Sequence, residues 1–327
     1  MPLLEFIKTG PICVIYHGKC IDGRTSLHIL ENYVNKHSLQ IAKSTEFFYS
    51  KPDIEPWIQS CRDQYKTPVF IYLDISHFHE FHDTDKVAII DHHYSSVLKL
   101  ADDKSAESDR SIILTNSSIR HTIFQSETDD LFVHIDCSRS TSSILSLITG
   151  YDENPDLVQI IDCVDMWDGK YQYLYHLYSG LNNRNFNDYK QIKNSYNDPI
   201  FKSIIESCED RVKTLIEVYK IQAQIFHKSR LKNEHLGLPT DKIITVISVP
   251  NSPDLNILFS EVMKVSNVSI VYCKIEIKND LYLIIARSRN INLPVLIQKM
   301  GFAGGGHVNA ATFTCHKSKF KNFFHEL

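Results

Sequence analysis

The chain lacks the features that mark membrane-spanning and disulfide-bonded proteins. No run of eighteen or more apolar residues occurs in its 327 residues, so nothing predicts a membrane span. Its eight cysteines are scattered without a Cys-x-x-Cys pair, which argues against a zinc ribbon and against a disulfide framework. The first eight residues are too short and too charged to resemble a signal peptide. Scattered free thiols fit a reducing compartment, so we expect a cytoplasmic location.

The chain also lacks an excess of basic residues. Its 35 Lys and Arg are outnumbered by 39 Asp and Glu, which gives a formal net charge of −4. A protein that binds long nucleic acid through electrostatic attraction normally has a basic face or a high pI. We therefore expect short substrates. The composition, 43% hydrophobic and 23% charged, is that of an ordinary globular protein, and the length allows two domains.

Acidic residues and histidines follow four short apolar runs. Val14–Tyr16 precedes His17 and Asp22, and Phe70–Leu73 precedes Asp74. Val87–Ile90 precedes Asp91, His92 and His93, and Ile160–Ile161 precedes Asp162 and Asp165. Ligands of an open α/β sheet bind beyond the carboxyl ends of its strands, so these side chains are expected to converge. Oxygen and imidazole ligands suit Mn²⁺ or Mg²⁺. The alternative is that the acids cap helix N-termini.

The first half of the chain alternates short apolar runs with helical patterns, which favours a parallel α/β sheet. We expect strands at 12–16, 69–73 and 87–90 and a helix at 25–35 after a loop at 17–24. The polar composition of segment 101–130 predicts an insertion. A helix is expected at 140–148, capped by Ser138 or Ser140.

The second half begins with apolar residues at helical spacing over 201–231, which predicts a long helix that links two domains. Strands are expected at 242–249, 268–277 and 281–286, with a hairpin turn at Asn279–Asp280. A short helix at 293–300 precedes a Gly-rich turn.

Six segments, in their order along the chain, resemble motifs of the DHH phosphoesterases that carry a C-terminal DHHA1 domain. They are Tyr16–Gly23, in the version His-x-x-Cys-x-Asp-Gly, Leu73–Ser76, Asp91–His93, Ile161–Trp167, Ala286–Ser288, and Gly304–His307 followed by Ala310 and Ala311. The resemblance implies a doubly wound, parallel-sheet DHH domain at 10–195 and a helical linker at 196–236. A smaller α/β DHHA1 domain would follow at 237–327, with the substrate in the cleft between the domains.

The resemblance also implies a set of metal ligands and catalytic residues. The metal ligands are His17, Asp22, Asp74, His92, Asp162 and Asp165, and they would hold two Mn²⁺ or Mg²⁺ ions with Asp74 as the bridge. His93 would orient the substrate or protonate the leaving oxygen. Asp91 would hold an imidazole in place. His93, Asp91 and Asp74 are thus the expected catalytic residues.

Cys20 stands where the commoner form of the first motif has an acid. A thiol is a softer and usually weaker ligand for Mn²⁺ or Mg²⁺, so one metal position would be looser. The alternative is a small buried residue that packs the loop. Both interpretations stay open from the sequence.

The C-terminal motifs predict a phosphate-binding or nucleotide-binding site. The expected substrate-binding residues are Arg287, Ser288, Gly304, Gly305, Gly306 and His307. Glycines let a backbone approach a ligand closely, and successive N–H groups can cradle a phosphate. An arginine adds a bidentate donor. The alternative is a Gly-rich turn that binds nothing.

The resemblance implies a hydrolase: a divalent-metal-dependent phosphoesterase that attacks short oligonucleotides or small nucleotides with a metal-activated water. The alternatives are a catalytically weak nucleotide-binding DHH-like protein and a single-strand exonuclease. An inorganic pyrophosphatase is disfavoured by Arg287 and the Gly-Gly-Gly-His segment. The expected partner is the nucleotide substrate, with no membrane, and a homodimer is possible.

Overall fold

The computed structural model describes two compact units of the chain. The described residues are 2–18, 20–48, 53–76, 78, 82, 85–102, 123–151, 155–166, 228–231, 245–249, 255, 258–259, 262–263, 269–278, 280–288 and 291–326. Those up to Met166 belong to the first unit and those from Lys228 onward to the second. Among these residues, no helix is both long enough and apolar enough to cross a membrane.

The first unit contains a six-stranded sheet in the order β2-β1-β3-β4-β6-β5. The strands are β1 Ile12–His17, β2 Ile41–Phe47, β3 Val69–Leu73, β4 Lys86–Asp91, β5 Ile123–Glu127 and β6 Leu131–Asp136. All neighbours pair in parallel except β5, which is antiparallel to β6. The predicted parallel sheet and its strands at 12–16, 69–73 and 87–90 are therefore confirmed.

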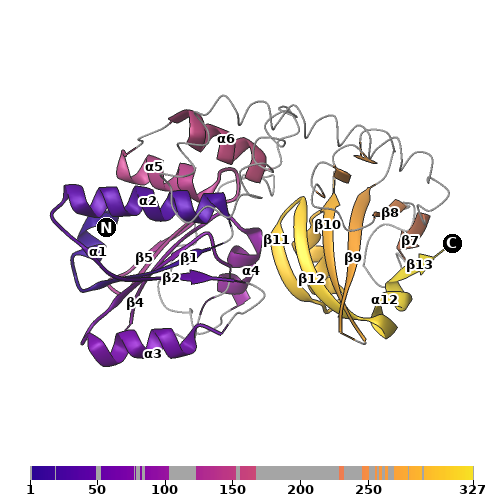
Figure 1. Cartoon of the computed structure of the whole chain (residues 1–327), viewed down its shortest axis with the longest axis horizontal. Coiled ribbons are helices and arrows are strands. Elements are labelled where there is room, and N and C mark those ends of the chain that lie inside the picture. Colours follow the sequence, from indigo (N-terminus) through magenta and orange to yellow (C-terminus); the bar gives the residue numbers. More distant parts are fainter. Residues whose placement is uncertain are drawn as a thin grey trace. The chain divides into compact units, whose positions relative to one another are not determined.

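Helices cover both faces of this sheet (Figure 1). They are α1 Leu3–Ile7, α2 Ile21–Lys36, α3 Glu55–Gln64, α4 Tyr94–Asp102, α5 Thr141–Thr149 and α6 Pro155–Asp165. α3 and α4 pack on one face with Phe70 and Tyr72, while α1, α2, α5 and α6 pack on the other with Val69, Ile71 and Leu73. Because both faces are buried, the strands are continuous apolar runs, which is why they could be read from the sequence.

Helix α2 begins at Ile21, not at Thr25, so the predicted loop at 17–24 is too long. Asp22 and Gly23 lie in its first turn. A Cβ atom on Gly23 would lie 2.4 Å from the carbonyl oxygen of His17. Only glycine therefore lets the helix start this close to the end of β1.

The pair Ile160–Ile161 is not the end of a strand. It lies in helix α6, so Asp162 and Asp165 are helical residues. The additional strand of the parallel set is β6, which the sequence analysis did not predict. β5 lies within the segment predicted as an insertion, where its polar composition hides an edge strand.

The second unit contains a seven-stranded sheet in the order β11-β12-β10-β9-β8-β7-β13. The strands are β7 Lys228–Leu231, β8 Thr245–Val249, β9 Ile270–Lys278, β10 Leu281–Ser288, β11 Ala303–His307, β12 Ala310–His316 and β13 Phe324–Glu326, and the helices are α11 Leu293–Lys299 and α12 Lys317–Phe323. Only β8 and β9 pair in parallel. Leu293, Leu296 and Ile297 of α11 pack on Ile284 and Phe313. A second, smaller α/β unit is thus confirmed.

The elements of the second unit correct two expectations. The predicted helix at 201–231 is wrong at its end, because 228–231 is strand β7; its other residues lie outside the described ones. The Gly-rich segment is not a turn but the edge strand β11. The hairpin of β9 and β10 is confirmed, whereas the expected boundaries at 195, 196 and 237 and Trp167 lie outside the described residues.

Candidate metal centre

The strand order contains a switch point between β1 and β3. From β1 the chain forms β2 on one side and then β3 on the other. The carboxyl ends of two such strands frame the crevice where open α/β sheets bind ligands. β1 ends at His17 and β3 is followed by Asp74, and Nδ1 of His17 lies 3.2 Å from Oδ2 of Asp74. The sequence motifs therefore lie where a ligand is expected.

Asp74 adopts a left-handed backbone conformation, with φ of 60°. Few residues other than glycine accept this region, although aspartate does so more readily than most. Its N–H donates to the carbonyl of Ile90 on β4, 3.2 Å away, which holds the turn in place. Such conformations concentrate at functional sites. Here the turn directs the carboxylate towards the residues that follow β4.

Four residues form the first ligand set: Asp22, Asp74, His92 and Asp165. One ligand atom from each lies within 4.8 Å of the others. Nε2 of His92 is 3.0 Å from Oδ1 of Asp74, 3.0 Å from Oδ2 of Asp165 and 3.6 Å from Oδ2 of Asp22. A single ring nitrogen can donate one hydrogen bond, so Nε2 of His92 does not satisfy all three carboxylates. Three carboxylates around one nitrogen fit a divalent cation better than they fit one proton.

A second ligand set consists of His17, Cys20 and Asp74, whose ligand atoms also lie within 4.8 Å of one another. Asp74 belongs to both sets, and its two oxygens are divided between them. Oδ1 faces His92, whereas Oδ2 faces His17. This division would let Asp74 contribute one oxygen to each set.

The ionisation of these groups follows from burial and from their neighbours. Burial raises the pKa of Asp22 to about 8, and the charges of Asp74 and Asp165 add to the increase. Burial also opposes the ionisation of Asp74, but hydrogen bonds with His17 and His92 hold its pKa well below the usual range. Burial disfavours the charged form of His92, yet Asp165 and Asp74 raise its pKa well above normal. A proton on His92 and a divalent cation would therefore compete for the same negative charge.

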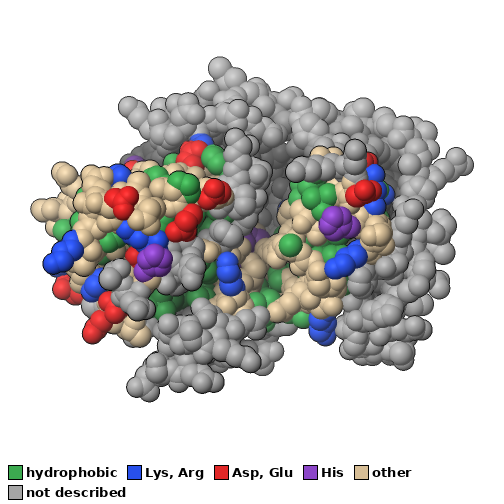
Figure 2. All heavy atoms as spheres, turned by 90° about the horizontal axis from the view of Figure 1, so that it is seen from below, with side chains coloured by type: hydrophobic (Ala, Val, Ile, Leu, Met, Phe, Trp, Pro, Cys, Tyr) green, Lys and Arg blue, Asp and Glu red, His purple; other side chains and the backbone are tan. Residues whose placement is uncertain are grey.

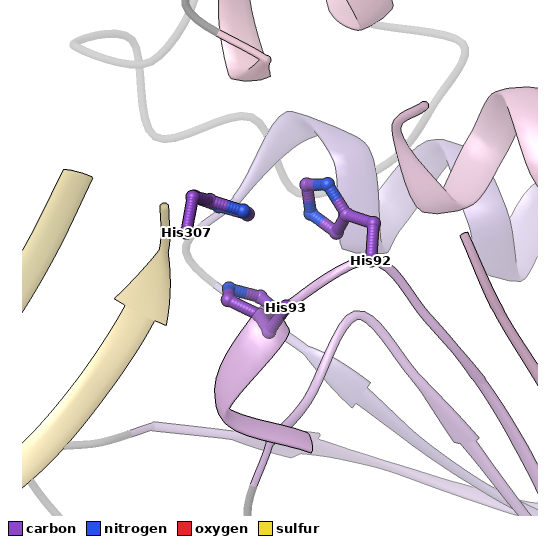
Figure 3. Close-up of side chains that lie close together, drawn as sticks. All are labelled: His92, His93 and His307. Atoms are coloured by element: carbon purple, nitrogen blue, oxygen red, sulfur yellow. The ribbon is translucent and has the colours of Figure 1, made fainter. Parts of the chain in front are cut away.

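His93 is held by a buried carboxylate. Nδ1 of His93 lies 2.7 Å from Oδ1 of Asp91, and the hydroxyl of Ser96 donates to Oδ2 of Asp91. Asp91 and Ser96 are completely buried. Burial lowers the pKa of His93, but the neighbouring Asp91 outweighs this effect and raises it. Figure 3 shows His92 and His93 as successive side chains between β4 and α4.

Asp22 and Asp162 also accept hydrogen bonds from the first turn of helix α5. Asp22 accepts from the N–H groups of Thr141 and Ser142, each at 2.8 Å, and Asp162 accepts from the N–H of Ser140 at 2.5 Å. The alternative that such acids cap helix N-termini thus describes both of them. Asp165 belongs to the first ligand set. The side chain of Asp162, also on α6, contacts the N-cap residue of α5 instead. Ser140 caps α5, as one of the two predicted caps.

The sequence analysis missed several residues that support the centre. Arg24 donates from Nε to the carbonyl of Gly18, at 2.6 Å, and from Nη2 to Oε1 of Glu46, at 3.2 Å. The hydroxyl of Tyr16 donates to the same oxygen of Glu46. These bonds tie the segment after β1 to β2. The hydroxyl of Ser96, which donates to Asp91, was also missed, as were the N–H groups of α5, whose partner Asp22 is distant in sequence.

Two of the predicted substrate-binding residues lie in one row of the second sheet. Arg287 on β10 and His307 on β11 are both register partners of Ala310 on β12, so their side chains share a face. His307 ends β11 (Figure 3). The guanidinium of Arg287 lies 5.6 Å from the centre of the Phe259 ring. This row presents a cation and an imidazole on one face.

Two other predicted substrate-binding residues, Ser288 and Gly304, make structural contacts. Ser288 is completely buried, and its hydroxyl donates to the carbonyl of Ile291 at 2.5 Å. A Cβ atom on Gly304 would lie 2.4 Å from the carbonyl oxygen of Thr312 on β12. The glycine at position 304 is thus explained by strand pairing alone.

Comparisons with known proteins give only distant structural matches. No protein-family model and no curated protein matches the chain. An exopolyphosphatase-related protein from Bacteroides fragilis matches with 13% identity and a TM-score of 0.39, over 94% of this chain and 88% of its own. The exonuclease RecJ bound to manganese matches with 12% identity and a TM-score of 0.43, over 97% and 89%. RecJ from Thermus thermophilus, in complex with Mn²⁺, gives 12% and 0.44 over 97% of this chain and 51% of its own.

At TM-scores of 0.39 to 0.44, these structural likenesses say nothing about chemistry.

Proposed function

We propose that the chain is a metal-dependent phosphoesterase that hydrolyses short oligonucleotides or small nucleotides. One observation carries the proposal: the carboxylates of Asp22, Asp74 and Asp165 converge on Nε2 of His92 at the carboxyl ends of the strands. This donor set of three oxygens and one nitrogen fits Mn²⁺ or Mg²⁺. A second, adjoining set shares Asp74.

Two divalent ions in these sets would supply an activated water and neutralise charge on the phosphoryl oxygens. Asp22, Asp74, His92 and Asp165 would hold one ion, and His17, Cys20 and Asp74 the other. The division of the Asp74 oxygens between the sets supports its role as the bridge. Of the two acids on α6, the distances favour Asp165 as the ligand, because Asp162 faces Ser140.

His93 is the residue best suited to hold a proton for the leaving oxygen. Asp91 fixes its ring through Nδ1 and favours the protonated imidazole. Nε2 is then the nitrogen from which a proton could pass to the leaving group. Ser96 in turn fixes Asp91, so the ring has one stable orientation.

A short substrate is supported by the charge distribution. The described acidic and basic side chains are mixed on the face drawn in Figure 2, without a continuous basic surface among them. Arg287 and His307, in one row of the second sheet, would supply donors for a phosphate or a terminal nucleotide. A limited number of cationic contacts suits a small ligand.

The test is hydrolysis of a panel of substrates with Mn²⁺. Di- to pentanucleotides, cyclic dinucleotides, a long single strand and inorganic pyrophosphate would be incubated with the protein, with and without chelator. We expect release of nucleotide products from the short substrates, and no release after chelation. Activity that survives thorough chelation would contradict the metal mechanism. Preference for the long strand would favour the exonuclease alternative.

A nucleotide-binding protein without catalysis is the second possibility. The feature that favours it is Cys20, because a thiol replaces a carboxylate in the second ligand set. Saturable binding of a dinucleotide in the presence of Mn²⁺, without cleavage over hours, would support it.

A further inference from the structure

We infer that the first turn of helix α5, residues 140–142, positions Asp22 for metal binding through its main-chain N–H groups. The inference rests on the proposed metal centre and adds a positioning element to it. The turn belongs to none of the segments in which the sequence showed a motif.

The turn donates a hydrogen bond to each oxygen of the Asp22 carboxylate. The N–H of Thr141 donates to Oδ2 and the N–H of Ser142 to Oδ1, each over 2.8 Å. One bond to each oxygen fixes the rotation of the carboxylate about its Cβ–Cγ bond. Asp22, Thr141 and Ser142 are completely buried, so water does not compete for these bonds. Each carboxylate oxygen keeps further lone-pair capacity for a cation.

The turn is itself anchored to the element that carries another ligand. The N–H of Ser140 donates to Asp162 on α6 at 2.5 Å, and α6 ends with Asp165. The hydroxyl of Ser140 accepts from the N–H of Ser143 and caps α5. One short segment therefore holds Asp22 on α2 and Asp162 on α6, and Asp162 lies three residues before the ligand Asp165.

The bond from Thr141 to Asp22 comes from the main chain. Among the described residues the buried hydroxyl of Thr141 has no hydrogen-bond partner, and its N–H is the group that contacts the carboxylate. Proline at position 141 would remove this N–H. Thr141 is the first residue of α5, the position at which helices favour proline. The preceding Ser140 has φ −71° and ψ 159°, which is the conformation that a residue before proline prefers.

The experiment compares Thr141→Pro with two controls. Thr141→Val keeps the N–H and the side-chain volume. Ser140→Ala removes the cap of α5 and should lower the unfolding midpoint, but it keeps the N–H groups of residues 140–142. Mn²⁺ affinity would be measured by titration calorimetry on each folded protein. Partners of this kind typically change metal affinity by about 10- to 100-fold, so we expect that loss for Thr141→Pro and none for the controls.

A role confined to fold stability predicts a different pattern. Ser140→Ala would then weaken Mn²⁺ binding at least as much as Thr141→Pro, and this result would overturn the inference. A folded Thr141→Pro protein with wild-type affinity would overturn it as well. If the proline variant does not fold, the α-hydroxy analogue of threonine at position 141 removes the same N–H and leaves the shape of the chain, and the same outcomes apply.

The wild-type measurement separates this inference from the proposed function. A wild-type protein that binds no Mn²⁺ contradicts the metal centre and the inference with it. Wild-type binding that Thr141→Pro leaves unchanged contradicts the inference alone.

Discussion

The two ligand sets on either side of Asp74 differ in burial and in donor chemistry. In the first set, the side chains of Asp22 and His92 have no solvent exposure, that of Asp165 is 16% exposed, and every donor is an oxygen or an imidazole nitrogen. In the second set, the side chain of His17 is 23% exposed and Cys20 contributes a thiol. A set of three carboxylates and an imidazole favours tight binding of a hard cation, whereas a set in which a thiol is one of three donors does not.

The difference implies unequal occupancy of the two positions. The first set would retain its ion at metal concentrations at which the second set is partly filled. Substitutions that affect one set, or both, can therefore separate their contributions.

The largest effect is expected for Asp74→Asn. Asp74 is shared by both sets, so the substitution removes a ligand charge from each. We expect phosphoesterase activity to fall on the order of 10³-fold and Mn²⁺ to dissociate from both positions. Activity assays and metal analysis by mass spectrometry would measure both effects. Retention of one tightly bound Mn²⁺ would show that the sets are independent and that Asp74 is no bridge.

Asp22→Asn and Cys20→Ser compare the two sets directly. A carboxylate binds a hard cation through oxygen, whereas the thiol must first lose a proton whose pKa is ordinarily about 8.5. We expect Asp22→Asn to lower turnover at least about 100-fold and Cys20→Ser to change it by less than about threefold.

Cys20→Asp adds a third comparison, because it restores the commoner form of the first motif. Metal content and turnover of all three variants decide the ranking. Equal losses in Asp22→Asn and Cys20→Ser would show that Cys20 is a ligand or an essential part of the structure.

A smaller effect is expected from pH in the metal-free protein. Asp22, with its pKa raised from 3.8 to about 8, and His92, with a raised pKa, hold protons more tightly in the folded state than in the unfolded state. Protons bound only by the folded state make stability fall as pH rises, here from the unfolded pKa of Asp22 towards about 8. The lowered pKa of Asp74 acts in the opposite direction only at more acidic pH.

Thermal unfolding at about pH 6 and about pH 8.5 would measure this dependence. We expect a lower midpoint at the higher pH without metal. With Mn²⁺ the fall should shrink or reverse, because the ion takes over the role of the proton and its affinity rises with pH. A metal-free midpoint that increases with pH would contradict the proton-bound first set.

The last effect is expected outside both sets, at Arg287. Arg287→Ala removes a bidentate donor, so we expect kcat/KM to fall about tenfold or more while Mn²⁺ affinity stays unchanged. Arg287→Lys should also be poor, because a point charge does not replace the planar fork. Lys319→Ala, at an exposed position of α12, serves as the control. A parallel loss of metal would contradict the assignment of Arg287 to the substrate.

The part of the centre that could be predicted is the part built from strand ends. His17, Asp74 and His92 each follow a run of apolar residues that is buried on both faces, and such a run is visible in the sequence. Ile160–Ile161 was too short to separate strand from helix, so Asp165 was assigned to the wrong type of element.

Other contributions have no side-chain signal. The hydrogen bonds from Thr141 and Ser142 to Asp22 come from main-chain N–H groups. Almost every residue type has such a group, so the sequence does not reveal these bonds. Glu46 reaches Arg24 from a neighbouring strand, a contact that depends on strand order. Strand order follows from packing of the whole unit, which local sequence patterns do not contain.

The position of Asp165 on helix α6 has a consequence for the dynamics of the chain. An ion in the first ligand set would act as a reversible cross-link, since it would join segments from residue 22 to residue 165. Cross-links that close long loops restrict the unfolded chain, and a ligand that binds only the folded state adds stability. Hydrogen exchange of α6 should therefore slow when Mn²⁺ is added, although the helix contributes a single carboxylate. The metal would then stabilise the folded chain as well as take part in catalysis.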